Sequence, residues 1–194
     1  MTGPVAITWL YPRVRSGASP MPFDLQPTLT GELVELRPLR PEDFPALYAV
    51  ASDPLVWEQH PNSDRYQEPV FRAFFRDALA SGGALVAIDR RDGRVIGSSR
   101  YNGYDEAAGE VEIGWTFLAR SHWGGVYNGE MKRLMLGHAF RFVRSVRFVI
   151  GARNFRSRRA VEKIGGILAV SKDDDAGEKV VYRIESPADP SRRS

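Results

Sequence analysis

The chain has 194 residues, of which 43% are hydrophobic, 26% charged and 11% aromatic, and this is the size and composition of one folded domain. Its 27 basic and 24 acidic side chains leave a net charge of +3, too weak a positive field to favour nucleic-acid binding. The absence of cysteine excludes disulfides, thiolate metal sites and a cysteine nucleophile, and three scattered histidines do not favour a metal centre.

The N-terminal segment has one short apolar run, residues 5 to 10, with no basic residue before it. No apolar span reaches the roughly 18 residues that a membrane helix needs, so the sequence disfavours secretion and membrane insertion and favours a cytoplasmic protein. A stretch containing Gly, Ser and Pro ends at residue 20, so we expect residues 1 to 20 to lie outside the domain. The expected organisation is an N-terminal extension, a domain and a C-terminal tail, at residues 1 to 30, 31 to 186 and 187 to 194.

The first elements are a strand and two helices. Residues 32 to 39 alternate between apolar and polar side chains and end at prolines, which predicts a strand. Residues 41 to 52 begin with proline and acids, as helix N-termini do. Residues 68 to 83 place their apolar side chains at helical spacing and end in glycines, which predicts a second helix.

Three antiparallel strands are expected next. Residues 84 to 101 form two β-rich runs around Asp92 and Gly93, a strong hairpin signal. Residues 109 to 118 then alternate along a third strand. One expected face of this strand carries Val111, Ile113, Trp115 and Phe117. The other carries Glu110, Glu112, Gly114 and Thr116.

The remaining chain predicts a helix from Asn128 to Val143, with Lys132 on its polar face. A strand over 146 to 152 and a short helix over 155 to 166 follow, and a strand pair around the "DDDAG" turn closes the chain. The element order predicts an α/β (α+β) domain with a mixed, mostly antiparallel central sheet of about seven strands and about four flanking helices.

Two segments narrow this class: "EIGWTFLARSHWGGVYNGEMKRLMLGHAF" and "NFRSRRAVEKIGG". Together they resemble the GNAT acetyltransferases, and among them the RimJ/RimL-like branch, in which an E-I-G-Y/W strand precedes a W-G-rich turn and N-x-x-S begins a helix ending in E-K-x-G. The resemblance covers residues 31 to 186. It implies the GNAT fold, acetyl-CoA as cosubstrate, no metal, and direct attack of an amine on the thioester in a ternary complex.

The resemblance places the cofactor's pyrophosphate at the turn, because glycines leading into a helix N-terminus supply convergent N–H donors and little bulk. The usual family turn, Q/R-G-x-G-x-G/A, aligns with residues 123 to 128. Asn128 is either the helix N-cap or a donor to the cofactor. Lys132 either adds charge near the phosphates or lies on a solvated face. The cofactor-binding candidates here are Phe117, Leu118, Trp123, Gly124, Gly125, Val126, Tyr127 and Asn128.

A second cofactor contact is expected at the start of the following helix. Four arginines crowd this N-terminus, where the helix dipole disfavours cations, so Arg158 and Arg159 either bind the 3′-phosphate of coenzyme A or form a solvated cluster. The resemblance implies that Asn154 holds the pantetheine arm and that Ser157 lies near the thioester sulfur. The alternative for Asn154 is a plain helix N-cap.

Acid–base chemistry requires a group that takes the proton of the attacking amine. Glu112, the glutamate of the E-I-G-W strand, is the catalytic candidate, with Glu110 as the second choice; the alternative for either is an exposed strand carboxylate. The family's tyrosine that protonates the leaving thiolate corresponds to Val161. This leaves Ser157, a water or no acid at all, and we take Ser157 as the candidate.

The acceptor side is expected under the first two helices and their loop. Trp57, His60, Glu110 and Glu112 are the substrate-binding candidates, although Trp57 is equally well explained as core and His60 as a loop residue. The acceptor is a protein N-terminus, an amino acid or aminoacyl compound, or a small amine, and the protein is a monomer or a homodimer. The alternative function is a catalytically silent module that binds acyl-CoA or a protein partner.

Overall fold

A computed structural model describes residues 23–174 and 177–187 of the chain. The expectations for residues 1 to 20 and for all but the first residue of the tail fall outside these ranges, as do Asp175 and Ala176 of the expected turn. None of the described helices is both long enough and apolar enough to cross a bilayer.

The described strands form one sheet of eight, in the order β1-β2-β3-β4-β5-β6-β8-β7. Neighbouring strands are antiparallel, except for β5 and β6, which are parallel. The strands are β1 Leu29–Thr30, β2 Val34–Pro38, β3 Ala84–Asp89, β4 Val95–Asp105, β5 Glu110–Leu118, β6 Ser145–Gly151, β7 Ile167–Asp174 and β8 Gly177–Glu185. The sequence predicts every strand except the two-residue β1, so the predicted mixed, mostly antiparallel sheet is confirmed.

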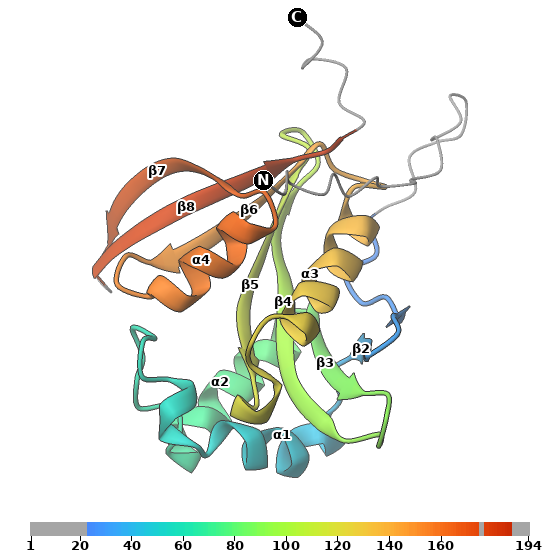
Figure 1. The fold of residues 1–194 in the computed structure, drawn as a ribbon, viewed down its shortest axis with the longest axis vertical. Coiled ribbons are helices and arrows are strands. Elements are labelled where there is room, and N and C mark those ends of the chain that lie inside the picture. Colours follow the sequence, from blue (N-terminus) through green and yellow to red (C-terminus); the bar gives the residue numbers. More distant parts are fainter. Residues whose placement is uncertain (1–22, 175–176, 188–194) are drawn as a thin grey trace, which may run out of the picture.

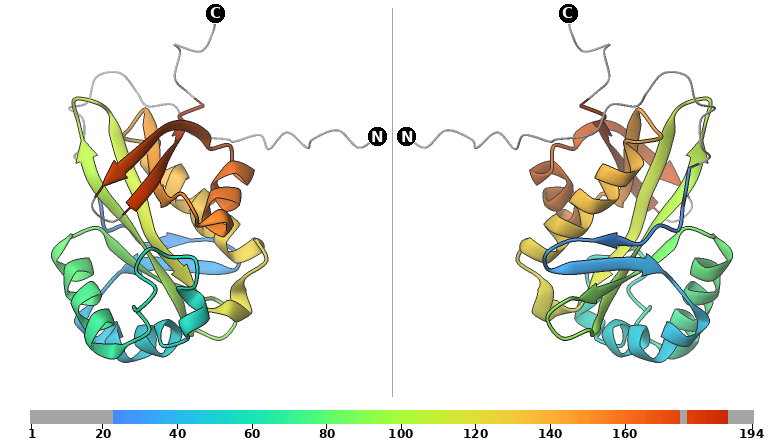
Figure 2. Two further views of the ribbon diagram at one scale, coloured as in Figure 1. Left: turned by 90° about the vertical axis from the view of Figure 1, so that its left-hand side faces the viewer. Right: turned by 90° about the vertical axis from the view of Figure 1, so that its right-hand side faces the viewer.

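The α-helices are α1 Phe44–Ala51, α2 Glu68–Ala80, α3 Val126–Ala139 and α4 Phe155–Lys163. Three 3₁₀ helices accompany them: η1 Pro41–Asp43, η2 Pro54–Val56 and η3 Arg120–His122. Figures 1 and 2 show α1 and α2 on one face of the sheet and α3 and α4 on the other. The helical periodicity explains this layering, because each helix buries one apolar stripe against the strands.

Each face of the sheet has its own core. Phe71, Phe74 and Phe75 of α2 pack with α1 on the first face, and Met131 and Met135 of α3 lead the core on the second. Residues 23 to 30 fall within the expected extension, and their first residue, Phe23, is 7% exposed in the α3 core. The described chain is therefore packed against the domain from its first residue.

A β-bulge in β5 corrects the predicted alternation of that strand. Gly114 lies opposite Arg100 and Phe117 lies opposite Ser98, so β5 carries one extra residue over this interval. Trp115 accommodates the extra residue with a φ of 51°, an unusual value for a side chain of this size. Because an added residue exchanges the two faces of a strand, the prediction that Phe117 shares a face with Val111 and Ile113 is wrong.

The side chains around the bulge follow from this exchange. Val111 and Ile113 lie in the α3 core, whereas Phe117 lies in the α1–α2 core. Leu118, one residue further, returns to the α3 core. The bulge therefore lets one strand supply apolar side chains to both cores.

Candidate active site

The candidate site starts where β5 and β6 stop pairing. The two strands pair only from Glu110 to Glu112 and from Ser145 to Arg147, although β5 runs on to Leu118 and β6 to Gly151. Figure 1 shows the two ribbons moving apart beyond this point. Both strands are fully described, so their facing edges lack ladder partners here, and a bound segment with amide groups would find hydrogen-bond partners on them.

The glycine turn before α3 has open space in front of its backbone. Gly124 and Gly125 have φ values of 102° and 118°, and a Cβ built on either residue would meet no atom within 4 Å. The first intrahelical bond of α3 runs from the Gly129 amide to the Gly125 carbonyl, at 2.8 Å. The amides of residues 126 to 128 therefore have no acceptor inside the helix. This arrangement suits an anion such as a pyrophosphate.

The start of α3 corrects the prediction for Asn128. The helix begins at Val126, and Gly125 is its N-cap, without a side-chain cap. A glycine with positive φ turns the chain directly into the helix, so no asparagine is needed there. Asn128 lies half-buried in the first turn. The other predicted role of Asn128, as a hydrogen-bond donor to the cofactor, stays a prediction.

A buried carboxylate fixes one side of the turn. Asp89, at the end of β3, accepts a hydrogen bond from the Tyr127 hydroxyl at 3.2 Å and lies 3.1 Å from His122 Nε2. Hydrogen bonds, led by those from Arg91, hold the pKa of Asp89 well below its usual range. Because Tyr127 is buried in this contact, only its backbone amide is available at the turn.

Trp123 fixes the other side of the turn, and Arg156 joins it to α4. The indole Nε1 donates to the Leu118 carbonyl at 2.9 Å, and the Arg156 guanidinium lies 3.9 Å from the centre of the indole ring. Arg156 Nη2 also donates to the Val56 carbonyl at 3.0 Å. One side chain therefore connects the glycine turn, the start of α4 and η2. The sequence places Arg156 only in a basic cluster.

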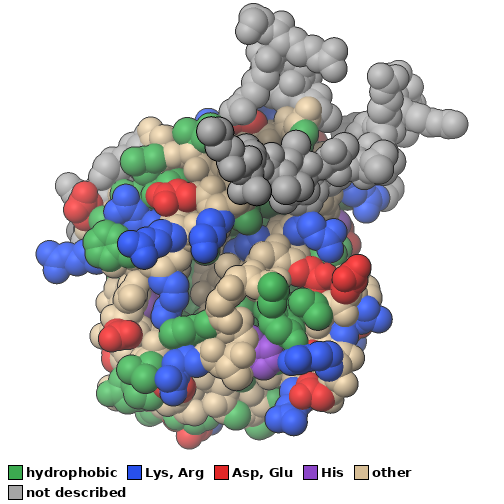
Figure 3. Space-filling model, in the orientation of Figure 1, with side chains coloured by type: hydrophobic (Ala, Val, Ile, Leu, Met, Phe, Trp, Pro, Cys, Tyr) green, Lys and Arg blue, Asp and Glu red, His purple; other side chains and the backbone are tan. Residues whose placement is uncertain are grey.

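The start of α4 confirms Asn154 as an N-cap, since its side chain accepts a hydrogen bond from the Ser157 amide at 3.1 Å. Ser157 is half-buried in the first turn. Arg158 donates to the Ala152 carbonyl at 2.9 Å and to the Tyr182 hydroxyl at 3.1 Å, whereas Arg159 is exposed. Figure 3 shows basic side chains gathered on the face that carries α4. Of the two candidate arginines, Arg159 is the more available to a phosphate.

Glu112 lies at the last paired position of β5 and is 8% exposed. Burial raises its pKa, against the opposing effect of Arg147, whose Nε lies 3.4 Å from the carboxylate. A Cβ on Gly114 would lie 3.2 Å from Glu112 Oε1, so the carboxylate leans along the strand toward the bulge. Glu112 is therefore a buried carboxylate with a raised pKa, not an exposed strand residue.

Glu110, the second candidate, is held more firmly. Its carboxylate pairs with Arg183 at 2.5 Å and accepts a hydrogen bond from Ser145 at 3.2 Å. It also lies 3.5 Å from Arg147 Nη1. These partners occupy both carboxylate oxygens, so Glu110 is less free than Glu112 to contact an acceptor.

Lys132 is the largest departure from the predicted site. It is 5% exposed, and its ammonium group lies 2.5 Å from Thr116 Oγ1 and 3.2 Å from Ser99 Oγ. Burial lowers its pKa to about 7. Both predicted locations, near the phosphates and on a solvated face, are wrong, because the bulge at Trp115 turns the Thr116 hydroxyl toward α3 and gives the lysine a polar contact inside the fold.

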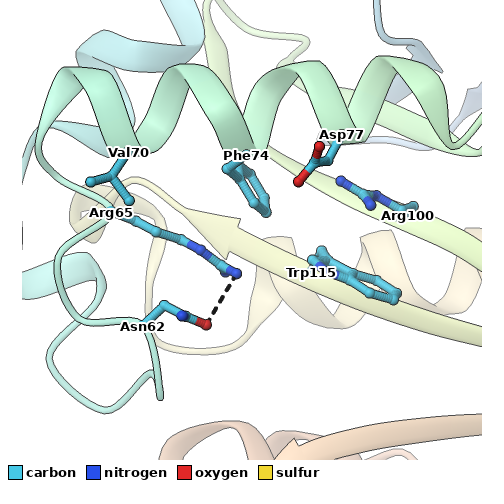
Figure 4. A pocket seen from close by; sticks show the side chains of 7 residues that line it. All are labelled: Asn62, Arg65, Val70, Phe74, Asp77, Arg100 and Trp115. Atoms are coloured by element: carbon cyan, nitrogen blue, oxygen red, sulfur yellow. Dashed lines mark hydrogen bonds between the residues drawn. The ribbon is translucent and has the colours of Figure 1, made fainter. Parts of the chain in front are cut away.

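A cavity of about 370 Å³ lies on the α1–α2 side of the sheet, next to the bulge (Figure 4). Its wall includes Arg65, Phe74, Arg100 and Trp115. Trp57 does not line it: this residue is 2% exposed, and its Nε1 donates to the Ala51 carbonyl at 2.7 Å, as a core residue would.

His60 lies behind the cavity, with its Nε2 atom 3.1 Å from Arg65 Nη1. Burial lowers the pKa of His60 to about 3, so the imidazole is neutral. It contacts the arginine and does not line the wall itself.

A sequence profile described as "Acetyltransferase (GNAT) domain" matches residues 34–167. The match covers more than half of the chain and includes the bulged strand, the glycine turn and α4. The chain belongs to the GNAT acetyltransferase family. No curated protein sequence matches it.

Solved structures of GNAT proteins share this fold. A GCN5-related N-acetyltransferase from Brucella melitensis has a TM-score of 0.76 at 19% identity, covering 89% of this chain and 84% of that one. Spermidine N-acetyltransferase from Vibrio cholerae, in complex with CoA and spermine, has a TM-score of 0.64 at 11% identity, covering 80% and 97%. Mycobacterium smegmatis RimJ, in complex with CoA-disulfide, has a TM-score of 0.61 at 19% identity, covering 81% and 84%.

In this GNAT domain, the structure brings the glycine turn next to the start of α4. The bulged strand leads directly into the glycine turn, and the Arg156–Trp123 contact joins the turn to α4. The burial of Lys132 and the contacts of Asp89 with Tyr127 and His122 were not predicted from the sequence, since both depend on contacts between segments far apart in the chain. Nor was Arg100 predicted as a pocket residue, because nothing in the local pattern of β4 marks an inward-facing arginine.

Proposed function

We propose that this GNAT domain is an acetyl-CoA-dependent N-acetyltransferase of the RimJ/RimL-like branch, in which a primary amine attacks the thioester directly in a ternary complex. The observation that carries the proposal is the glycine turn, where three amides lack intrahelical acceptors and the two preceding glycines have open space beside their backbone. Acetyl-CoA supplies the activated acetyl group. We assign the acetyltransferase function to residues 31 to 186, against which residues 23 to 30 pack, and the protein to the cytoplasm.

The residues proposed to hold acetyl-CoA belong to the end of β5, the glycine turn and the start of α4. The side chains of Phe117 and Leu118 are each 5% exposed, so these residues contribute through their backbone. Arg159 offers an exposed cation for a phosphate. The full set is Phe117, Leu118, Trp123, Gly124, Gly125, Val126, Tyr127, Asn128, Asn154, Ser157, Arg158 and Arg159.

Glu112 is proposed to accept the proton of the amine. A general base works best when its pKa lies close to the working pH, and burial moves the pKa of Glu112 in that direction. Ser157 is proposed to donate a proton to the leaving sulfur, because Val161, at the position of the family's tyrosine, is 4% exposed and carries no proton to give. Glu110 and His60 are proposed to lie on the acceptor side of the site.

The acceptor class is a primary amine: a protein N-terminus, an amino acid or aminoacyl compound, or a small amine. Spermidine N-acetyltransferase, one of the similar structures, holds spermine, which supports an amine acceptor here. The protein acts as a monomer or a homodimer.

The test is the release of thiol from acetyl-CoA in the presence of a panel of amines, with the acetylated product identified by mass spectrometry. Amine-dependent thiol release is the expected result. The buried valine at position 161 favours one alternative, a catalytically silent acyl-CoA-binding module. Binding of acetyl-CoA by calorimetry without thiol release for any amine would support that module, and absence of both would reject the two together.

A further inference from the structure

The cavity beside the bulge contains two arginines that form no ion pair with any residue that the structure describes. Arg100 rises from β4 and Arg65 enters from the loop before α2, and Figure 4 shows both guanidinium groups at the pocket below α2. Among the described residues, neither has a carboxylate at ion-pair distance. A buried cation without an anion is costly, so this arrangement is expected to serve a ligand.

Arg100 is the stronger of the two observations. It is 6% exposed, and its Nε and Nη2 atoms are enclosed without a hydrogen-bond partner. Its guanidinium lies 4.7 Å from the centre of the Trp115 ring, on the residue that forms the bulge. The aromatic face compensates part of the charge but accepts no conventional hydrogen bond, so Nε and Nη2 still lack an acceptor.

Arg65 is satisfied only in part. It donates to Asn62 Oδ1 at 3.3 Å, and it lies 3.1 Å from His60 Nε2. A neutral imidazole accepts a hydrogen bond at one nitrogen only. The backbone N–H of Asn62 already donates to His60 Nδ1 at 3.0 Å, so Nε2 has no acceptor site for Arg65. Burial and the nearby charge of Arg100 lower the pKa of Arg65 to about 10, and the carboxylates of Asp64 and Asp77 oppose this shift only in part.

Asp77 does not remove this positive charge. It is the one carboxylate among the lining residues, it is exposed, and it acts on both arginines from beyond ion-pair distance. Two arginines and one aspartate leave the wall with a net positive charge. A volume of about 370 Å³ accommodates a small acid or a side chain, and not a nucleotide or a folded surface.

We propose that Arg65 and Arg100 bind a carboxylate of the acceptor, so that the substrate is a small amine that also carries an acid group, such as an amino acid. This inference rests on the proposed acetyl transfer and names its substrate class. Trp115 forms both the pocket wall and the bulge beside the unpaired edge of β5, so a carboxylate held here would keep the attached amine close to that edge. The guanidinium fork binds a carboxylate through two parallel N–H···O bonds, and phosphate is the other anion that such a fork accepts.

The experiment compares amino acids with their amides as acceptors, which differ only in the carboxylate. We expect a KM about tenfold or more lower for the acids, and we expect Arg100→Met and Arg65→Met to bring the acid-to-amide ratio close to one. Arg76→Met, an exposed arginine on α2, is the matched control and should leave the ratio unchanged. Phosphoethanolamine against ethanolamine tests the other anion, and a preference for the phosphorylated amine alone would overturn the carboxylate assignment.

Calorimetry with N-acetyl amino acids and their amides tests the pocket without any turnover. Selective binding of the acids, lost in Arg65→Met, supports the proposal even if Arg100→Met does not fold. Equal acetylation of acids and amides would reject the carboxylate pocket while leaving acetyl transfer intact. Selective acid binding without thiol release would support the pocket and reject the transferase function.

Discussion

The buried lysine of α3 gives the sharpest quantitative prediction. Lys132 has an ordinary pKa of 10.5, which burial lowers to about 7 in the folded chain. The unfolded state therefore binds more protons than the folded state between these two values, and stability must rise as the pH rises through this window. Below the folded pKa the penalty is complete, and above the unfolded pKa it is absent.

The size of the effect follows from the two pKa values. Where the unfolded chain holds one proton more than the folded chain, the unfolding free energy rises by about 1.4 kcal/mol per pH unit, and integration from about pH 7 to about pH 9 gives a gain of about 2 kcal/mol from this group. Lys132→Met removes the charge, and Ser99 and Thr116 can still bond each other at 2.8 Å. We therefore expect the variant to be more stable than wild type at pH 7, by a margin that shrinks by about 2 kcal/mol at pH 9.

Urea denaturation followed by tryptophan fluorescence at pH 7, 8 and 9 measures this difference. Other titrating groups are common to both proteins and cancel. Lys163→Met, at an exposed position of α4, is the matched control and should differ from wild type by the same amount at every pH. Parallel stability curves for wild type and Lys132→Met would refute the assignment of a low pKa to this lysine.

The other predictions concern the cofactor turn and the proposed base. Gly125→Asp places a carboxylate at the turn and should weaken acetyl-CoA binding about a hundredfold or more by calorimetry, whereas Gly93→Asp, at a positive-φ glycine with equally open surroundings, should not weaken it. Unchanged affinity in Gly125→Asp would place the pyrophosphate elsewhere. Because Glu112 must be ionised to act as a base and its pKa is raised, kcat should fall as the pH falls through that pKa. Glu112→Gln should lower kcat about a hundredfold and remove this limb of the pH profile, whereas Glu110→Gln should retain the limb. A pH profile of Glu112→Gln that matches the wild-type profile would remove Glu112 from the mechanism.

Local patterns predicted most of the fold, because the periodicity of each segment is a property of that segment alone. The apolar spacing of α2 and the Asp92-Gly93 turn are examples, and both elements are where the sequence places them. The bulge at Trp115 could not be predicted in this way. The apolar and polar residues of β5 alternate regularly in the sequence, although the strand contributes side chains to two cores. Only the pairing with β4 shows where the extra residue lies.

For the candidate site, the sequence indicates features of the backbone, and it does not indicate side-chain positions that depend on tertiary contacts. Two glycines before a helix indicate an anion site from sequence, and the structure has free amides at that point. Lys132 is different: helical geometry places it beside Met135 and Ala139 on the buried stripe of α3, but its charge alone assigns it to the polar face. Its polar contacts inside the fold come from hydroxyl groups, one of which the bulge turns toward it. The missing hydrogen-bond partners of Arg100 Nε and Nη2 likewise result from the residues that pack around β4, and not from the sequence of β4 itself.

The most direct test of the account is acetyl transfer itself. The purified chain is incubated with acetyl-CoA carrying a deuterated acetyl group and a pool of amines that includes the free amino acids, and the products are read by mass spectrometry. We expect the label to move to the amino group of an acceptor in proportion to the thiol released, and we expect Gly125→Asp to lower both strongly. An absence of labelled amine, together with no measurable binding of acetyl-CoA to the wild-type chain, would contradict the proposed function.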